Sequence, residues 1–398
     1  MNPLFEKIKS IVYFASLELY SIVKDSGVVL IFFVAPLIYP ALYSFVYQKE
    51  ALQDLPVAVI NLDNSQTSRT FINMLDATST LSVAEKVQDF HQAQQLFLNK
   101  KIYGIITVDK GFERDVLRGE QAHIGVYSDG SYLMHYKTVL TTATKTGLTF
   151  GGGVQAKKLL MSGVPESQLM AKINPVNLVS KPLFNASGGY GTYLMPAIAA
   201  LVIQQLLLIG IGMIGGTHRE SNEGKFVLPK VVTERGWESW FLGRALTYFF
   251  IFMLASFYLF IVIFKWFEFP IHGNSVDVML FLVPYVLASV FLSMWLSTYF
   301  RFRVQSMMLF LFSSFVFLFV SGISWPVEAF PPFFKWLAYI IPSTHGIQGI
   351  VKLQIFGADL TAVQPQLNAL WTLCLVFFST AVLRFWQLSR KQELHNEI

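Results

Sequence analysis

The chain has 398 residues, of which 54% are hydrophobic and only 14% charged, and its formal net charge is +5. Soluble domains usually carry about 25% charged residues, so the composition argues against an ordinary soluble enzyme and excludes a disordered chain. The single cysteine, Cys374, excludes an intrachain disulfide and a cysteine-based metal site. A modest positive charge without a basic patch gives no sign of nucleic-acid binding. The composition fits a membrane protein whose apolar residues gather in long runs.

Residues 1–26 are predicted to form an amphipathic helix lying in the inner membrane interface. Its apolar side chains recur with helical spacing. The apolar positions are Leu4, Ile8, Ile11, Val12, Ala15, Leu19, Ile22 and Val23. A soluble helix packed on another domain is the alternative.

Six stretches free of Asp, Glu, Lys and Arg are long enough to cross a hydrocarbon core of about 30 Å as helices. They are Gly27–Tyr47, Leu194–Gly216, Ala245–Phe264, Val278–Phe300, Val304–Val327 and Gln366–Leu383. The first, residues 27–47, lacks the form of a signal peptide, so we expect a retained anchor. A seventh stretch, Trp336–Val351, is short and broken by Pro342, so we expect a re-entrant or interfacial element.

Residues 48–191 are predicted to form an α/β extracytoplasmic domain inserted between spans one and two. Short β-branched runs bounded by turn residues predict strands at Val57–Ile60, Tyr103–Val108 and His123–Tyr127. Helical patterns lie between and after them, at Ser68–Asp76, Phe90–Lys100, Phe112–Leu117 and Tyr132–Met161. Glycines at 147 and 151–153 are expected to kink or break the last of these helices.

Residues 192–390 carry spans two to six, and 391–398 form a tail. The fold class expected is therefore an α-helical integral membrane protein with six transmembrane helices and an inserted α/β domain. Residues 217–244 form a polar loop large enough to be a docking surface. Residues 322–350 form an outer hairpin with repeated prolines, which is tolerated at membrane depth where the freed backbone groups line a cavity or gate.

The distribution of Lys and Arg predicts the orientation. With the N-terminus inside, the inner segments hold thirteen of these residues and the short outer loops hold three. Long domains cross the membrane largely regardless of their charge. We therefore expect both termini in the cytoplasm and residues 48–191 outside, which in a bacterial inner membrane means in the periplasm.

Several motifs, in this order along the chain, make it resemble the type-2 ABC transporter permeases. The resemblance is to the bacterial export branch, which carries a large extracytoplasmic domain between the first two spans. The motifs are Val57–Asp63 with Ser65 and Ser68-Arg69, Gly111–Asp115 with Arg118-Gly119, Asp129–Ser131, and Leu183–Asn185 with Tyr193 and Pro196. The outer hairpin, with Pro331 and Pro342–Thr344, is similar to the re-entrant element of that family.

The resemblance implies that the inner loop couples the permease to an ATPase. The residues that match the coupling loop are Arg219, Glu220, Glu223, Gly224, Gly243 and Arg244. Lys225 stands where relatives have threonine. The chain lacks the phosphate-binding Gly-x-x-x-x-Gly-Lys-Ser/Thr loop. The resemblance therefore implies an ABC ATPase subunit that binds ATP and magnesium, and a second permease copy or a paralogue. A periplasmic adaptor and membrane lipid are further expected partners, and no cofactor is expected in this chain.

No catalytic or metal-ligating motif is present, and the seven histidines lack metal-ligand spacing. The residues that we assign to a translocation path or gate are Gln204, Gln205, Gly322, Trp325, Pro326, Pro342 and His345. The two glutamines either hold helices together or line a wet path. His345 has either a pH or substrate role or a structural one.

We therefore predict the permease subunit of an ATP-driven exporter. The six charge-free stretches argue against an ion-coupled carrier, which needs intramembrane acids or bases. They suit an amphiphilic or hydrophobic substrate such as a drug-like compound or a lipid. The alternative is a multi-span envelope protein whose external domain senses or binds a ligand without transport.

Overall fold

A computed structural model describes residues 3–48, 52–176, 178–185 and 188–396. The chain forms two compact units. One comprises Met1–Glu50 with Pro182–Ile398, and we call it the bundle. The other comprises Ala51–Lys181, and we call it the α/β unit. The inserted domain was predicted to span residues 48–191, which begins three residues before the compact unit and ends ten residues after it.

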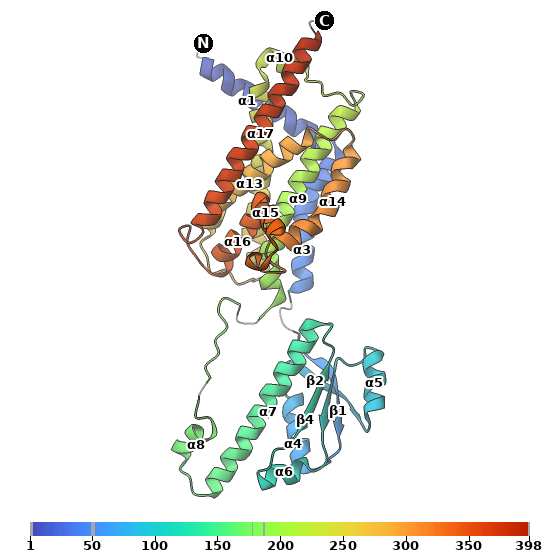
Figure 1. Ribbon diagram of the computed structural model, residues 1–398, viewed down its shortest axis with the longest axis vertical. Coiled ribbons are helices and arrows are strands. Elements are labelled where there is room, and N and C mark those ends of the chain that lie inside the picture. The colour runs from blue at the N-terminus through green and yellow to red at the C-terminus, as the bar shows by residue number, and fades with distance from the viewer. Residues whose placement is uncertain (1–2, 49–51, 177, 186–187, 397–398) are drawn as a thin grey trace. The chain divides into compact units, whose positions relative to one another are not determined.

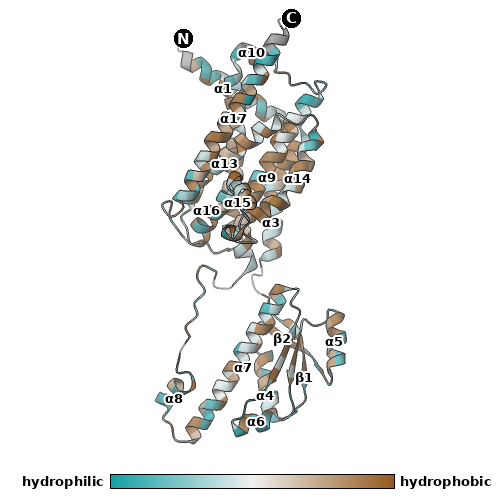
Figure 2. Ribbon diagram, in the orientation of Figure 1, coloured by the Kyte–Doolittle hydropathy of each residue, from teal (hydrophilic) through white to brown (hydrophobic). Residues whose placement is uncertain are grey.

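The bundle contains the six predicted spans as helices of the length and hydropathy that a membrane crossing needs, and this prediction is confirmed for the described residues. The spans are Ser26–Tyr47, Tyr190–Glu220, Trp237–Trp266, Ser275–Ser297, Arg303–Val320 and Gln364–Gln392. In Figure 2 their surfaces are mainly brown, the colour of apolar residues. All six begin one or more residues before their charge-free stretch, and the second, third and sixth also extend beyond its end.

The first and third spans each contain a π-helical turn. The first consists of α2 (Ser26–Val29), the turn Leu30–Val34 and α3 (Ala35–Tyr47). The third consists of α11 (Trp237–Phe257), the turn Tyr258–Ile263 and α12 (Phe264–Trp266). The remaining spans are α9 (Tyr190–Glu220), α13 (Ser275–Ser297), α14 (Arg303–Val320) and α17 (Gln364–Asn396). The predicted tail therefore continues the last helix as far as Asn396.

Helix α9 is the core of the bundle, with 83% of its most apolar window buried, whereas the corresponding share of α14 is 17%. Two glycines allow these helices to approach closely. A Cβ atom on Gly212 would lie 2.5 Å from Ser306 Cβ, and one on Gly216 would lie 2.7 Å from Arg303 Cα. Glycines spaced four apart are a common means of close packing between membrane helices.

Helix α1 (Pro3–Lys24), α10 (Lys230–Arg235) and the last turns of α17 lie at the same end of the bundle (Figure 1). We call this the terminal end. Toward the opposite end lie α15 (Pro332–Ile340) and α16 (Pro342–Ile350), followed by a π-helical turn at Val351–Ile355. The chain breaks at Ile341, so Trp336–Val351 forms parts of two short helices, neither of them among the candidate spans.

Helix α1 packs on α11 through a face that only partly overlaps the one predicted from the apolar spacing. Phe14 and Ile22 are buried, whereas Ile8, Val12 and Val23 of the predicted apolar face are more than half exposed. An exposed apolar face suits contact with lipid. The helix therefore has two apolar faces, and one of them is used for packing within the chain.

The α/β unit contains a four-stranded sheet in the order β2-β1-β3-β4. Its strands are β1 (Leu55–Asn61), β2 (Leu81–Val87), β3 (Gly104–Val108) and β4 (Ile124–Ser128). β1 pairs in parallel with β2 and β3, and β4 pairs antiparallel with β3. Because β1 is central, both of its faces are buried, which agrees with its uninterrupted apolar run.

Helices cover both faces of this sheet. Val57 and Val59 join the core under α4 (Gln66–Asp76) and α7 (Leu133–Met161), while Ala58 and Ile60 join the core under α5 (Phe90–Leu98). The remaining helices of the unit are α6 (Phe112–Arg118) and α8 (Glu166–Ile173).

Three local predictions in this unit differ from the structure. The strand β2 was not predicted because it is an edge strand whose residues are half exposed, so it lacks an apolar run. The helix α8 was not predicted either. The expected break in α7 is wrong, because the helix is continuous through its glycines. Phe150 packs on Phe71 and Phe112 there, and that burial outweighs the cost of about 1 kcal/mol per glycine.

The motif residues of the α/β unit have a capping role. The carboxylate of Asp63 accepts the backbone N–H groups of Gly111 and Glu113 at 2.8 and 3.1 Å, at the start of α6. In return, Glu113 Oε1 accepts the backbone N–H of Thr67 at 3.2 Å, at the start of α4. Each acid thus satisfies N–H groups that a first helical turn leaves free.

Candidate functional site

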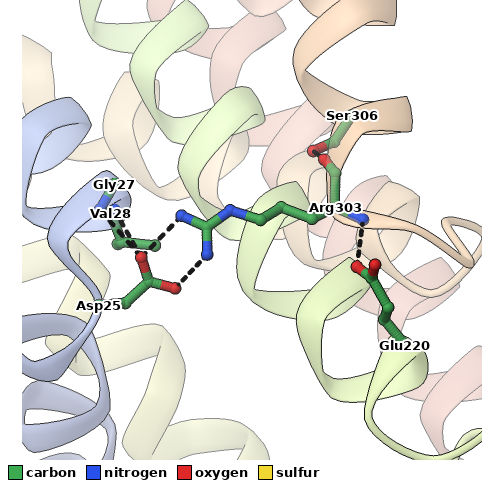
Figure 3. A network of polar contacts seen from close by, with 6 residues as sticks. All are labelled: Asp25, Gly27, Val28, Glu220, Arg303 and Ser306. Carbon is green, nitrogen blue, oxygen red and sulfur yellow. Dashed lines mark hydrogen bonds and ion pairs between the residues drawn. The ribbon is translucent and has the colours of Figure 1, made fainter.

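At the terminal end of the bundle, an ion pair joins the first span to the fifth (Figure 3). The guanidinium of Arg303, the first residue of α14, donates to both carboxylate oxygens of Asp25 at 2.6 and 2.7 Å. Asp25 also caps α2, because its Oδ1 accepts the N–H groups of Gly27 and Val28 at 3.0 and 3.1 Å. A bidentate pair of this kind fixes geometry as well as charge.

The second span contributes to the same network. Glu220 is the last residue of α9, and its Oε2 accepts the backbone N–H of Arg303 at 3.3 Å. The hydroxyl of Ser306 donates to the Arg303 carbonyl at 3.0 Å, one turn further along α14. Spans one, two and five are therefore tied at one point, which we call the Asp25–Arg303–Glu220 network.

The Arg303 guanidinium keeps Asp25 ionised. Its hydrogen bonds lower the pKa of Asp25 below the ordinary value, partial burial opposes this, and the N–H groups of Val28 and Gly27 lower the pKa further. A Cβ on Gly27 would lie 2.2 Å from an Arg303 nitrogen, so a side chain at position 27 would displace the guanidinium.

The predicted coupling loop, 217–244, is mostly helical in the structure. Arg219 and Glu220 end α9, a turn and an extended segment follow at 221–229, and α10 and α11 complete it. Glu223 and Gly224 both have a positive φ, at 54° and 78°, and Glu223 is exposed. Gln392 of α17 accepts the N–H of Leu228 at 2.7 Å and donates to its carbonyl at 3.2 Å, so the extended segment is fixed to the last helix.

Gly243 and Arg244 do not lie in a loop, which corrects the sequence-based placement. Both are inside α11, where it crosses α1, and a Cβ on Gly243 would lie 2.7 Å from the carbonyl oxygen of Ile11. Arg244 Nε lies 3.0 Å from Glu18 Oε1, and both side chains are almost fully buried. Tyr248 completes this buried triad, accepting from Arg244 at 2.9 Å and donating to Glu18.

Five of the six helices that contain the charge-free stretches also carry charged residues toward their ends, and in the third span one of these, Arg244, is buried. The charge-free stretch begins at Ala245, one residue after Arg244, but the helix begins at Trp237 and includes the arginine. The ion pair with Glu18 of α1 compensates the buried charge within the bundle.

Gln204, in the middle of α9, connects this helix to α16. Its Oε1 accepts the backbone N–H of Ser343 at 2.7 Å, in the first turn of α16, where that N–H has no partner within the helix. Both amide atoms of Gln205 and the hydroxyls of Ser343 and Thr344 are buried without a hydrogen-bond partner among the described residues. Gln204 therefore holds two elements together, and the polar atoms around it have hydrogen-bonding capacity left over.

The other predicted gate residues lie in or beside the hairpin. His345 is buried in α16, and its Nε2 lies 3.0 Å from the carbonyl oxygen of Tyr339 in α15. Pro342 begins α16. Gly322 has a φ of 89°, Trp325 is exposed, and Pro326 precedes a short 3₁₀ turn at Val327–Ala329. The hydroxyl of Tyr193 in α9 donates to the Ile323 carbonyl, which ties the hairpin to the second span.

Four residues of these networks were missed in the sequence: Glu18, Asp25, Tyr248 and Arg303. A signal for Glu18 was present, since it lies four residues after Phe14 and four before Ile22 and so shares their buried face. Asp25 and Arg303 are separated by 278 positions, so spacing alone could not pair them. Among the described residues, no group of three His, Cys, Asp or Glu side chains could hold a metal ion.

The bundle and its polar networks define a class of protein. Six membrane helices carry an interrupted hairpin toward one end and interlocked charges at the other, an arrangement suited to moving a solute and receiving force from outside the membrane.

Comparison with known proteins gives the family. The family described as ABC-2 family transporter protein matches residues 27–383, and the chain belongs to it. The chain is also 20% identical over 346 residues to ABC transporter G family member 20 of Dictyostelium discoideum. That match covers 83% of this chain and 45% of the relative, so the chain spans less than half of that protein's length. The resemblance to type-2 ABC permeases is thereby confirmed, and the chain is a permease component of an ABC transporter.

Proposed function

We propose that this permease is an exporter that moves an amphiphilic or hydrophobic substrate out of the cytoplasm or inner leaflet. An ABC ATPase that binds ATP and magnesium supplies the energy by docking on the exposed turn 221–224 and the segment that follows. The proposal rests on the placement of charge. Glu220 directly precedes this segment, and Arg244 lines a cavity together with Phe226, Val227 and Pro229 of the segment.

The observation that carries the proposal is the hydrogen bond from Arg303 to Glu220. Glu220 directly precedes the docking segment, and Arg303 begins α14. A push on the segment therefore reaches the start of α14 through one residue. The same arginine holds Asp25, so the first span moves with the fifth.

Helix α14 is the element that this movement displaces. Much of it is exposed and aromatic, including Phe312, Phe315 and Phe319. We propose that this face meets a second permease copy or a paralogue across the translocation path. An aromatic path suits an apolar or amphiphilic solute, and Gln204, Gln205 and His345 provide polar groups beside it.

The Lys and Arg distribution supports an inner-membrane protein with both termini in the cytoplasm and residues 48–191 in the periplasm. There the α/β unit is placed to guide substrate outward or to bind a periplasmic adaptor. A purely ligand-sensing envelope protein is disfavoured by membership in a transporter family.

The test uses the permease and its co-expressed ATPase in lipid vesicles, with ATP hydrolysis as the readout. In Glu220→Gln the acceptor of the Arg303 backbone N–H loses its charge, and in Arg303→Gln the ion pair with Asp25 is lost. We therefore expect stimulation of hydrolysis by the permease to fall about tenfold in each variant. Co-purification with the ATPase should persist.

The matched control is Glu238→Gln. Glu238 also lies at the terminal end, but its ion pair with Lys7 is exposed and contributes little. Normal stimulation in all three variants would contradict the coupling route, and failure of every form to bind the ATPase would contradict the docking segment.

A further inference from the structure

A basic feature lies at the terminal end whose lining does not include Asp25, Glu220 or Arg303. It is a cavity of about 40 Å³ between the ends of α9, α11, α13 and α17 and the segment 225–229. His218, Arg219 and Arg244 line it together with three aromatic residues, Phe226, Trp240 and Phe385. Since a water needs about 10–15 Å³ by this measure, the cavity holds about three waters. A tetrahedral phosphate group fills a comparable space.

The cations around this cavity outnumber the acids. The charges that act on Arg219 are those of Arg384 and Arg301, both positive. Arg244 has Glu18 as its partner. Of the two acids of the adjoining turn, Glu220 faces the backbone of Arg303, and Glu223 is exposed.

The arginines of this cluster have unused donors. Within the described part of the chain, two buried Nε atoms have no hydrogen-bond acceptor: that of Arg219, which lines the cavity, and that of Arg384, which precedes the lining residue Phe385. Buried charges are normally paired, and a buried donor without an acceptor costs free energy. The cluster therefore lacks an anion.

Aromatic rings hold the guanidinium groups by their faces. Arg219 lies over Phe226 at 5.7 Å, Arg244 over Trp240 at 4.8 Å and Arg384 over Tyr299 at 4.9 Å from the ring centroids. The N–H groups of Arg244 are engaged by Glu18 and Tyr248, whereas the N–H groups of an arginine that packs on a ring without such partners can match the oxygens of a phosphate.

We propose that this cavity binds the phosphate of an anionic phospholipid. Basic pockets between membrane helices on the cytoplasmic side bind such head groups. Exposed apolar side chains on the two flanking helices can receive the acyl chains, among them Leu246 and Phe250 on α11 and Leu383 on α17. The bound lipid would join α9, α11 and α17 and stabilise the docking segment against them.

The test uses the delipidated full chain in detergent, with thermal unfolding and native mass spectrometry as readouts. Phosphatidylglycerol should raise the unfolding temperature and remain bound as one molecule, whereas an uncharged galactosyl diacylglycerol should do neither. In Arg219→Gln and Arg384→Gln variants, the concentration of phosphatidylglycerol needed should rise at least about tenfold. Arg235→Gln is the matched control, since Arg235 also lies over a ring, Tyr13 at 4.3 Å, at the terminal end but outside the cavity.

Three results would overturn the proposal. The first is an equal shift with the uncharged lipid. The second is an equal shift with inorganic phosphate at the same concentration, which would assign the cavity to a free anion. The third is an unchanged lipid response in both the Arg219→Gln and the Arg384→Gln variant, which would mean that the arginines only stabilise helix ends or await an acidic group of the ATPase. If Arg219→Gln fails to fold, Arg384→Gln and lipid retention by the wild type still decide the matter.

Discussion

Glu18 and Arg244 form an ion pair in which both side chains are shielded from solvent, with exposed fractions of 7% and 4%. Such a pair contributes little net stability compared with apolar residues of the same size, but its disruption leaves a buried charge alone. The main effect of the ion pair is therefore to position the two helices that carry it. It fixes where α1 crosses α11, at Gly243, where the two backbones approach closely.

Removal of either residue of the ion pair should weaken the packing of α1 on α11. We expect Glu18→Ala to lower the free energy of unfolding by about 3 kcal/mol, because Arg244 is left unpaired. Thermal unfolding in detergent measures the loss, and proteolysis near residue 24 should become faster. Tyr248→Phe, which leaves the ion pair intact, should cost about 1 kcal/mol.

The double variant Glu18→Leu/Arg244→Met separates the two roles. It removes the charges together, so most of the stability should return. Glu238→Ala, at an exposed pair, is the control and should have an effect below about 1 kcal/mol. If Glu18→Ala and Glu238→Ala were equally stable, the ion pair would not hold the helix.

At the scale of elements, the reciprocal caps of α4 and α6 make the α/β unit sensitive to acid. Partial burial raises the pKa of Asp63, but hydrogen bonds from Ser65 and from the N–H groups of Glu113, Gly111 and Phe112 lower it, and the net shift is downward. A carboxyl whose pKa is lower in the folded state stabilises that state above its unfolded pKa of about 3.9. The contribution is lost as the pH falls through the folded value.

Hydrogen exchange of the full chain can measure this. Protection factors at the start of α6 should be constant from neutral pH to about pH 4 and fall below it. In Asp63→Asn they should be lower at neutral pH, and the part of the acid-induced fall that Asp63 contributes should be absent.

Asp89→Asn is the matched control, because Asp89 caps α5 by accepting the N–H of Gln92 at 2.8 Å. It should reduce protection in α5 and leave α6 unchanged. A wild-type acid response in Asp63→Asn would show that another group is responsible.

The elements that could be predicted are those with a strong local pattern. Charge-free runs identified the six spans, and β-branched runs identified β1, β3 and β4. The edge strand β2 has no such pattern. In α7, the packing of Phe150 outweighs the low helix propensity of the glycines. The coupling residues Gly243 and Arg244 were predicted to lie in a loop, but the structure places both in a helix.

The polar networks were the least predictable part. Arg303 and Asp25 were visible only as charges at helix ends, and their pairing depends on which helices become neighbours. Gln204 was expected either to hold helices together or to line a path. The first role is observed directly in its bond to Ser343, and a role along a path stays a prediction.

At the scale of the molecule, the orientation in the membrane is the property that the charge distribution predicts most directly. In a Cys374→Ser background, a cysteine introduced by Gln121→Cys in the α/β unit should react with an impermeant maleimide added outside cells. A cysteine introduced by Ser221→Cys, in the docking turn, should react only after permeabilisation. Both positions are exposed in the structure, so the fold of the chain does not block the reagent at either site.

The reverse labelling pattern would invert the orientation. Labelling of both sites from outside would show leaky cells, which the Cys374→Ser background without a new cysteine and a cytosolic marker protein would reveal.

The contact between Tyr47 and Tyr190 has a consequence for how such a protein changes over time. Their ring centroids are 5.4 Å apart, and a Cβ on Gly191 would lie 2.8 Å from the Phe269 ring and 3.0 Å from the Tyr47 carbonyl oxygen. The first and second spans thus meet where the α/β unit is attached, and the bundle is closed without it. A segment attached at two adjacent points is a module that can be exchanged without rebuilding its host. Evolution can therefore change the binding surface of the α/β unit while the helices of the bundle stay the same.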